Sequence, residues 1–292
     1  MRPLPIALAL TLLATGFAAA QEPRADSPAK ELFGRAKDAA PLKARAIGFY
    51  SKGCLAGAIA LPVNGQTWQV MRLSRNRNWG HPNLISFLER FAQRVPRVAQ
   101  GWNGILVGDL SQPRGGPMLT GHASHQLGLD ADIWPPPIPA RTLSPEGRKS
   151  SPPQLMVRKD RKDIDPKVWT PGHVRVIRAA AEDPLVERIF VNAAIKKALC
   201  REAGSERAWL TKVRPYWGHD YHMHVRMKCP ADSPACTPQP EPGGDDGCGA
   251  ELESWFRESI INPPPPKVKP KPKPPLKMSE LPAGCRDVLL AK

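Results

Sequence analysis

The sequence lacks several patterns that would assign its 292 residues to a familiar class of protein. None of the six cysteines forms a C-x-x-C pair, which argues against a four-cysteine zinc site and a thioredoxin-like redox motif. No internal repeat is visible. Ser27 and Lys30 match the S-x-x-K motif of penicillin-binding enzymes, but no Lys-Thr-Gly partner occurs anywhere. The match is therefore attributed to chance, and β-lactams would find no serine to acylate.

Long hydrophobic runs are also absent, with one exception at the N-terminus. Ile6 to Phe17 is almost entirely apolar, follows the positive charge of Arg2, and is followed by Ala18-Ala19-Ala20. This order predicts a signal peptide, residues 1–20, that is cut after Ala20. The alternative is an uncleaved anchor, but the run is too short to cross ~30 Å of hydrocarbon comfortably. We expect an exported protein without a transmembrane segment.

The chain is strongly basic, with a formal net charge of +15. A basic chain can indicate a nucleic-acid partner, but no nucleic-acid-binding motif is recognisable, and export separates the protein from such partners. We expect no nucleic-acid partner. Attraction to an anionic envelope surface is the simpler interpretation of the charge.

The remaining sequence divides into three parts by composition. Residues 21–45 form a polar lead-in, residues 46–262 hold nearly all apolar patterning and all seven histidines, and residues 263–292 are rich in Pro and Lys. The tail begins with Pro263-Pro264-Pro265-Pro266, which predicts a cationic, polyproline-like segment that packs no core. Cys285 lies beyond this segment and is expected to tie the tail back to the body.

Residue periodicity predicts alternating helices and strands in the central part. Helices are expected after His81-Pro82, after Thr170-Pro171 and over Ala193 to Leu199. Short strands are expected over Gly104 to Leu110, Leu129 to Ile133, Arg188 to Val191 and Tyr221 to Met227, and a long loop over the proline-rich residues 135–153. We predict an α+β fold with a small antiparallel central sheet that carries the functional site, with flanking helices and long loops.

Five of the seven histidines fall in two short segments. The first is Gly121-His122-Ala123-Ser124-His125-Gln126-Leu127-Gly128-Leu129-Asp130-Ala131-Asp132, and the second is Trp217-Gly218-His219-Asp220-Tyr221-His222-Met223-His224-Val225. Scattered surface histidines would rarely cluster in this way. The two remaining histidines, His81 and His173, are expected to cap helices or face solvent.

Strand geometry makes these segments more informative. Residues two apart on a strand face the same side, so His222 and His224 should project together, as should Asp130 and Asp132. Gly128 permits a tight bend just before the second pair. Two such strands side by side would present imidazoles and carboxylates to one point.

A His, an Asp and a second His suffice for a catalytic zinc site. Three protein ligands leave the fourth position open for water, whereas a structural site would use four. A nearby histidine that is not a ligand could then transfer protons, since its unperturbed pKa is ~6.5.

The motif resembles a known group of enzymes. His-x(6)-Asp followed far downstream by His-x-His is the signature of the metallopeptidases named for lysostaphin, D-Ala-D-Ala carboxypeptidase and sonic hedgehog. Within this group, Gly-His-Ala-Ser-His-Gln-x-Gly-Leu-Asp-x-Asp closely resembles the family of penicillin-insensitive murein endopeptidases. Further segments that are similar to this family span residues 51–54, 190–192, 212–215, 222–226, 229–233 and 247–252. The resemblance covers about residues 45–262 and, weakly, the tail around Cys285.

The resemblance implies a role for each matching residue. Zn²⁺ would be held by His125, Asp132 and His224. His222 would be the catalytic proton donor and acceptor. His122 and His219 match histidines that line the family's site, as auxiliary ligands or as hydrogen-bonding supports.

Two further carboxylates bear on the metal site. Asp160 matches an auxiliary metal-site aspartate of the family, whereas Asp163 stands where the family has a histidine. This departure argues against a second metal site. Asp130 is expected to support a ligand or the fold and not to bind the metal.

The even number of cysteines in an exported chain predicts three disulfides. Cys229 and Cys236 are close in sequence and form the simplest local pair. Sequence physics leaves three pairings of the other four cysteines open. The family resemblance implies Cys200–Cys248 and Cys54–Cys285.

The resemblance also implies the activity. It predicts a periplasmic endopeptidase that hydrolyses the D-alanyl–meso-diaminopimelyl cross-link of peptidoglycan, with attack by zinc-bound water and His222 as proton shuttle. The peptide cross-links of peptidoglycan would be its partner. A D-Ala-D-Ala carboxypeptidase is the enzymatic alternative, and a non-catalytic zinc- or wall-binding protein is the alternative from another class. The sequence leaves the oligomeric state open, a homodimer included.

Overall fold

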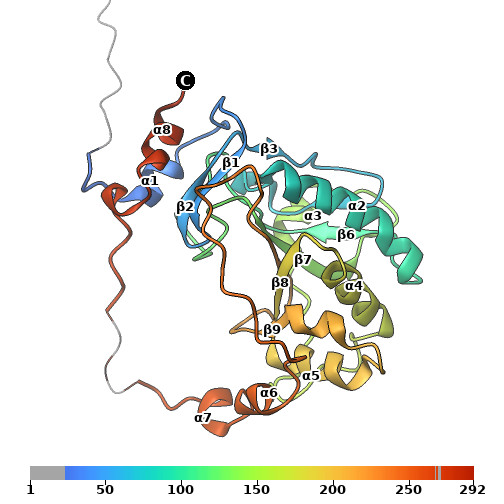
Figure 1. Cartoon of the computed structure of the whole chain (residues 1–292). Coiled ribbons are helices and arrows are strands. Elements are labelled where there is room, and N and C mark those ends of the chain that lie inside the picture. The colour runs from blue at the N-terminus through green and yellow to red at the C-terminus, as the bar shows by residue number, and fades with distance from the viewer. Residues whose placement is uncertain (1–23, 267, 269–270) are drawn as a thin grey trace, which may run out of the picture.

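The computed structural model describes residues 24–266, 268 and 271–292 (Figure 1). The predicted signal peptide, residues 1–20, lies outside the described residues. Within the described part of the chain, no helix is both long enough and apolar enough to span a membrane.

A six-stranded mixed sheet lies at the centre of the fold, in the order β4-β6-β7-β10-β8-β9. Its strands are β4 Trp68–Val70, β6 Ile105–Val107, β7 Asp130–Pro137, β8 Val186–Val191, β9 Val213–Pro215 and β10 Met223–Met227. Two separate antiparallel pairs join β1 Arg45–Phe49 to β2 Lys52–Ala56 and β3 Ile59–Ala60 to β5 Trp79–Gly80. The predicted α+β class is confirmed.

The direction of pairing changes across the sheet. The inner pairs β6–β7, β7–β10 and β10–β8 are antiparallel, but β4–β6 and β8–β9 at the two edges are parallel. The expected antiparallel sheet is therefore right for the inner strands and wrong for both edges. Parallel neighbours require a crossover connection, usually through a helix. Here α2 (Pro82–Val98) connects the first parallel pair, while α5 (Ala193–Glu202) and a 3₁₀ turn, η2 (Ala208–Lys212), connect the second.

The three helices expected from periodicity are present: α2, α4 (Pro171–Ala181) and α5. In α2 and α4 a proline occupies the first turn, where its missing N–H is not needed. His81 caps α2 by accepting from the Asn83 amide at 3.2 Å, and His173 caps α4 by accepting from the Thr170 amide at 3.0 Å. Both histidines are buried, so they cap helices and do not face solvent.

The proline-rich segment over residues 135–153 was expected to be a loop, and this prediction is wrong in two places. Strand β7 continues to Pro137, but Ile133 is its last residue that pairs with β10, opposite Met223. The missing proline N–H groups therefore break no hydrogen bond on that side. A short helix, α3 (Pro145–Ser150), begins after the N-cap Ser144, which accepts from the Gly147 amide at 3.1 Å.

The main core lies between the sheet and the helices α2, α4 and α5, which gather on one side of it in Figure 1. Helix α2 contributes Phe87, Leu88 and Phe91, which follow the helical repeat, and the inner strands contribute Ile189 and Val225. The opposite side of the inner strands is left for polar side chains.

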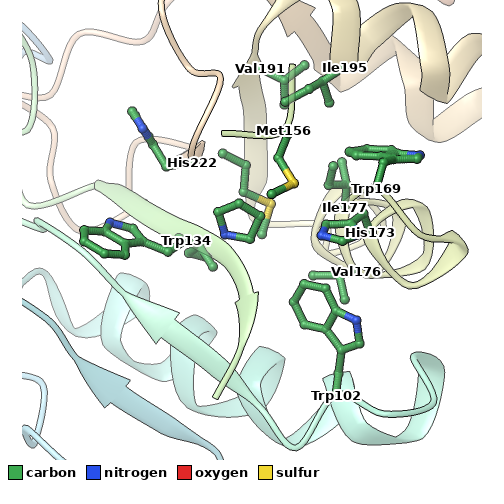
Figure 2. A pocket seen from close by; sticks show the side chains of 13 residues that line it. Trp102, Trp134, Met156, Trp169, His173, Val176, Ile177, Val191, Ile195 and His222 are labelled. Atoms are coloured by element: carbon green, nitrogen blue, oxygen red, sulfur yellow. The ribbon is translucent and has the colours of Figure 1, made fainter. Parts of the chain in front are cut away.

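A small apolar cavity of about 20 Å³ remains between α4 and the sheet (Figure 2). Trp102, Trp169 and His173 line it on the helix side, and His222 lies at its edge. One side of His222 therefore borders the apolar core.

A second, smaller core forms where the two ends of the described chain meet. We call it the terminal cluster; it consists of Ala29, Phe33, Ala40, Cys54, Ala56, Met278, Leu281, Cys285 and Val288. Its secondary structure is α1 (Ala29–Phe33), η3 (Met278–Glu280) and α8 (Gly284–Leu290). The described residues of the Pro/Lys segment up to Pro275 are exposed and pack no core, as expected. The residues that follow, from Met278 on, do join a core, and the bridge between Pro28 and Lys277 lies beside it.

Three elements complete the fold: the 3₁₀ turn η1 (Leu73–Arg75) and the short helices α6 (Ala250–Ser254) and α7 (Glu258–Ile261). Three disulfides join Cys54 to Cys285, Cys200 to Cys248 and Cys229 to Cys236. This is the pairing that the family resemblance implies, and no described cysteine is free.

Candidate metal centre and active site

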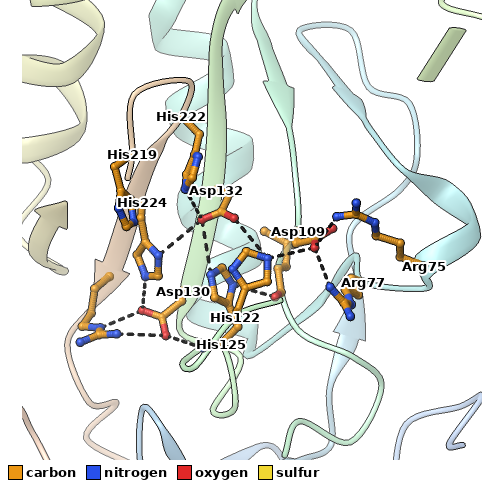
Figure 3. A network of polar contacts seen from close by, with 12 residues as sticks. Arg75, Arg77, Asp109, His122, His125, Asp130, Asp132, His219, His222 and His224 are labelled. Carbon is orange, nitrogen blue, oxygen red and sulfur yellow. Dashed lines mark hydrogen bonds and ion pairs between the residues drawn. The ribbon is translucent and has the colours of Figure 1, made fainter. Parts of the chain in front are cut away.

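Strands β7 and β10 bring the two histidine-rich segments together. They pair antiparallel, with His224 directly opposite Asp132 and Arg226 opposite Asp130. Strand β10 begins at Met223, so His222 stands immediately before it. Figure 3 shows His222, His224 and both aspartates on the same side of these strands.

A tight bend between His125 and strand β7 places His125 beside these residues. Gly128 has φ +65°, and a Cβ at this position would lie 2.3 Å from the Leu55 side chain, so only glycine fits without strain. His125 itself adopts φ 67°, which is uncommon for a residue with a side chain. Its amide donates to Asp130 Oδ2 at 2.9 Å, and this hydrogen bond helps to hold the unusual conformation.

Three imidazole nitrogens converge on one oxygen of Asp132. Asp132 Oδ1 lies 3.4 Å from His125 Nε2, 3.4 Å from His224 Nδ1 and 3.5 Å from His222 Nε2 (Figure 3). These separations are longer than good N–H···O hydrogen bonds. Two ligands that each lie about 2.0–2.1 Å from a tetrahedral zinc ion would be about 3.3–3.4 Å apart, so the spacing fits shared coordination.

His122 belongs to the same group. Its Nε2 lies 3.6 Å from Asp132 Oδ2, and the potential ligand atoms of His122, His125 and Asp132 all lie within 4.8 Å of one another. Below, we call His122, His125, Asp132, His222 and His224 the histidine–aspartate centre. The structure thus places the expected auxiliary ligand as close to Asp132 as the expected principal ones.

Hydrogen bonds fix which nitrogen is free in two of the imidazoles, those of His125 and His224. His125 Nδ1 lies 2.8 Å from the Leu110 carbonyl oxygen, which can only accept, so Nδ1 carries the proton and Nε2 has a free lone pair. His224 Nε2 donates to Asp130 Oδ1 at 2.9 Å, which leaves Nδ1 free toward Asp132. A ligand histidine whose second nitrogen donates to a carbonyl or carboxylate is typical of metal sites.

Asp130 organises the centre from beneath. It is fully buried and accepts from the His125 amide, from His224 and from Arg226 Nε at 2.8 Å. Burial alone would raise the pKa of Asp130, but the Arg226 guanidinium and then the imidazoles outweigh it and hold this pKa far below its usual range. Asp130 is therefore a buried anion that holds His125 and His224 in place.

Burial also sets the charge of the histidines. Desolvation lowers the pKa of His222 to about 4 and that of His224 to about 4, despite the nearby carboxylates. The pKa of Asp132 is held well below its usual value, because the attraction of His125 and the other imidazoles overcomes its burial. The structure therefore favours neutral His222 and His224 beside an ionised Asp132. The pKa of His125 moves the other way: burial would lower it, but the carboxylates of Asp132, Asp130 and Asp109 raise it above its ordinary value, so a bound metal would have to displace a proton from this residue.

Several buried atoms here lack a hydrogen-bond partner among the described residues. They are His125 Nε2, Asp132 Oδ1 and His222 Nδ1. An unsatisfied buried polar atom costs about 1–3 kcal/mol, so native structures rarely leave several together. The first two point toward each other, as expected for atoms that share a metal ion.

His219 and Asp160 occupy different surroundings. His219 lies beside the centre, with its ring 4.7 Å from that of His222, and its Nδ1 donates to the Trp217 carbonyl at 2.7 Å. Asp160 lies on an exposed loop, pairs with Arg158 at 2.9 Å and is not part of the compact ligand group. Asp163, the departure from the family pattern, pairs with Arg201 at 3.1 Å and Lys197 at 3.6 Å of α5. Its charge is thus already matched by cations of the protein.

Sequence reasoning missed Asp109, which holds His122. The carboxylate is buried, and its Oδ2 accepts from His122 Nε2 at 3.0 Å, Arg75 at 2.9 Å and Arg77 at 2.8 Å. Burial opposes ionisation of Asp109, but His122 and the two arginines lower its pKa to about 2. An ionisable residue inside the apolar run from Gly104 to Leu110 was the available signal, and so was the Arg-x-Arg spacing of Arg75 and Arg77.

The centre opens into a cleft of about 840 Å³. Its lining includes four histidines, Arg75 and two exposed aromatic residues: His122, His219, His222, His224, Tyr216 and Trp217. A cleft of this size admits an extended peptide or a small oligosaccharide and exposes it to the histidine–aspartate centre.

Comparisons with known proteins place the chain in a family. A family model described as penicillin-insensitive murein endopeptidase matches residues 46–290. A protein of that name from Haemophilus influenzae is 49% identical over 251 residues, which cover 85% of this chain and 83% of the relative. A protein of the same name from Pectobacterium atrosepticum is 47% identical, over 73% of this chain and 75% of the relative. Another from Escherichia coli O1:K1 is 43% identical, over 85% of this chain and 87% of the relative. This chain belongs to the family of penicillin-insensitive murein endopeptidases.

Proposed function

We propose that this protein is a zinc-dependent endopeptidase of the periplasm that hydrolyses the D-alanyl–meso-diaminopimelyl cross-link of peptidoglycan. The names of its relatives support the substrate class. The predicted signal peptide, residues 1–20, supports export, and residues 46–262 would form the catalytic region.

The observation that carries the proposal is the convergence of three imidazoles on Asp132. Their nitrogens lie 3.4–3.5 Å from Asp132 Oδ1, and two of the facing atoms have no hydrogen-bond partner among the described residues. Nitrogen and carboxylate oxygen are ligands that zinc prefers. The donor set and its spacing therefore fit a zinc ion.

We assign the ligands as His125, Asp132 and His224, with His122 as an auxiliary ligand. The anchoring of His125 by the Leu110 carbonyl and of His224 by Asp130 supports this choice, because ligand imidazoles are usually oriented by such bonds. Three ligands would leave a coordination position open to water, as in catalytic zinc sites.

When bound, zinc would lower the pKa of a coordinated water to ~7 and polarise the scissile carbonyl. His222 is suited to move the proton, because its Nδ1 is not held by a hydrogen bond from any described residue and its ring lines the cleft. Its Nε2 lies 3.5 Å from Asp132 Oδ1, so the ring is close enough to exchange a proton with a group that binds beside Asp132. We assign it the transfer of a proton to the leaving amine.

The two alternative functions, a non-catalytic wall-binding protein and a D-Ala-D-Ala carboxypeptidase, require different features of the site. A wall-binding protein without activity would not need the combination of three oriented ligands with an unanchored His222. A D-Ala-D-Ala carboxypeptidase would use the same chemistry on a chain end. The products separate these possibilities.

The test uses purified cross-linked muropeptide dimers and the mature protein. We expect dimers to become monomers, a chelator to stop the reaction, and added Zn²⁺ to restore it. Release of free alanine without monomers would show a carboxypeptidase. Full activity in chelator, with no metal detected in the protein, would overturn the zinc assignment.

A further inference from the structure

A second groove of about 340 Å³ adjoins the catalytic cleft. Tyr216, Trp217 and Gly218 line both spaces and form the wall between them. The far side of the groove is made by the loop over residues 155–161, by Trp255 directly after α6, and by the end of α7. In Figure 1, α6 lies next to α5, and α7 follows α6. None of the residues assigned to the metal or to proton transfer lines this groove.

The groove combines aromatic and cationic side chains. Trp217 is 57% exposed, and its ring lies 5.2 Å from that of Trp255 in an edge-on arrangement, which gives an apolar ridge. Arg158, Lys159 and Arg161 line the other side. Exposed tryptophans and arginines are typical of binding surfaces, because they supply large contact areas at low entropic cost.

The charges of the groove are only partly satisfied. Arg158 pairs with Asp160, and Arg161 donates to the Ile261 carbonyl at 3.3 Å. Lys159 has no hydrogen bond or ion pair with any described residue. With the charge of Arg158 matched by Asp160, Lys159 and Arg161 remain as cations of the lining against one acidic residue, Asp220. The groove is therefore suited to a ligand that carries carboxylates.

The groove is also tied to the segment that carries the catalytic histidines. The Met156 amide donates to the Asp220 carbonyl at 2.7 Å, and the Asn192 amide donates to the His219 carbonyl at 3.0 Å. These bonds fix the shared wall against the loop and α5. A substrate peptide that extends from the cleft past Trp217 would enter the groove directly.

From this continuity and charge we infer that the groove binds the carboxylate-bearing peptide arm of the substrate that extends beyond the scissile bond. The inference rests on the proposed function, because a cross-link joins two peptide arms and diaminopimelate is a dicarboxylic amino acid. The apolar ridge contacts the aliphatic part of the arm, and Lys159 and its neighbours bind its carboxylates.

The test measures binding of the full mature protein to insoluble peptidoglycan in the presence of chelator, so that no hydrolysis is needed. Lys159→Glu alters the groove alone, and Trp255→Ala removes the ring that packs against Trp217 of the shared wall. Lys149→Glu makes the same charge change on α3, outside the groove, and is the matched control. We expect each groove variant to bind roughly threefold to tenfold more weakly, the control to match the wild type, and salt to reduce the difference between Lys159→Glu and the wild type.

The ligand is identified with soluble probes. The tripeptide L-alanyl-γ-D-glutamyl-meso-diaminopimelate should compete for binding, and its amidated form should compete at least tenfold less well. Groove variants that bind like the control would overturn the inference, and so would an equal loss of binding to glycan strands stripped of peptide. Lys159 is exposed, so a folding defect does not confuse the result. A wild-type protein that binds as expected but cleaves no dimer would overturn the proposed function and leave the groove assignment standing.

Discussion

The histidine–aspartate centre and the terminal cluster are both buried, and both join distant parts of the chain, but they are built on opposite principles. The centre gathers polar side chains whose nitrogens and oxygens leave hydrogen bonds unmade. The terminal cluster gathers apolar side chains around the Cys54–Cys285 disulfide, 231 residues apart in sequence. The unmade hydrogen bonds of the histidine–aspartate centre lower the stability of the fold but leave polar atoms available for a ligand. The terminal cluster and its disulfide instead raise the stability, because they join the two ends of the described chain. Substitutions in the two regions should therefore separate activity from stability.

The largest effect on activity is expected from the ligands. His125→Ala, Asp132→Ala and His224→Ala should each abolish bound zinc and reduce hydrolysis of muropeptide dimers to background, because three ligands leave no redundancy. Metal analysis of the purified variants checks this expectation. Full zinc retention by any one of them would remove that residue from the ligand set and would favour His122 in its place.

His222→Ala should retain zinc but lose activity. Removal of a general acid–base group costs ~10²–10⁴-fold in rate. The measurement is kcat on dimers together with metal content. The matched comparison is His224→Ala, which changes the same residue type two positions along on the same face of the strand. If His222→Ala loses the metal and His224→Ala keeps it, the two roles are exchanged.

Asp130→Asn should have a smaller effect, through the ligands that Asp130 positions. The amide keeps the shape of the side chain but removes the negative charge that His224 and Arg226 share. Loss of such a support typically weakens metal affinity 10–100-fold, so activity should return at high Zn²⁺ concentration. Titration of the chelated variant with Zn²⁺ tests this; an unchanged affinity would show that Asp130 serves the fold alone.

The sequence was a good guide to the centre because the chemistry of a metal site requires particular residues at short spacings. His122, His125, Asp130 and Asp132 lie within eleven residues, and His222 and His224 are two apart on one face. Asp109 escaped because its two local signals, a lone carboxylate after an apolar run and the Arg75-x-Arg77 spacing, are far apart in sequence, and only the fold brings them together at His122. The role of Asp109 at His122 therefore follows from its position in the fold and not from a local sequence motif.

The terminal cluster and the parallel edges of the sheet could not be predicted for the same physical reason. Phe33 lies in the pair Leu32-Phe33, and Val288 begins the short run Val288-Leu289-Leu290; both stretches are too short for their periodicity to carry a signal. Their burial depends on pairing between Pro28 and Lys277, which are almost 250 positions apart. Strand direction at the edges likewise depends on where α2 and α5 cross, a property of tertiary packing.

The smallest effect on activity is expected from the disulfide of the terminal cluster. Replacement of both Cys54 and Cys285 by Ser should leave the rate per folded molecule and the zinc content close to those of the wild type, because neither cysteine lines the cleft. Stability should fall, since a crosslink that closes so long a loop restrains the unfolded chain by roughly 2–5 kcal/mol. For a protein of this size, that corresponds to a loss of about 5–15 °C in Tm.

The matched control for this variant is the local bridge. Removal of Cys229–Cys236 opens a loop with a sequence separation of only 7 and should cost less. Melting curves and dimer hydrolysis, measured on the same preparations, decide the matter. A large loss of kcat in the folded Cys54/Cys285 variant would show that the terminal cluster helps to shape the cleft, through Tyr50 and Ser51 on the β1–β2 turn, and the separation of activity from stability would fail. A melting temperature equal to that of the wild type would show instead that the apolar contacts of Phe33 and Val288 hold the two ends together without the crosslink.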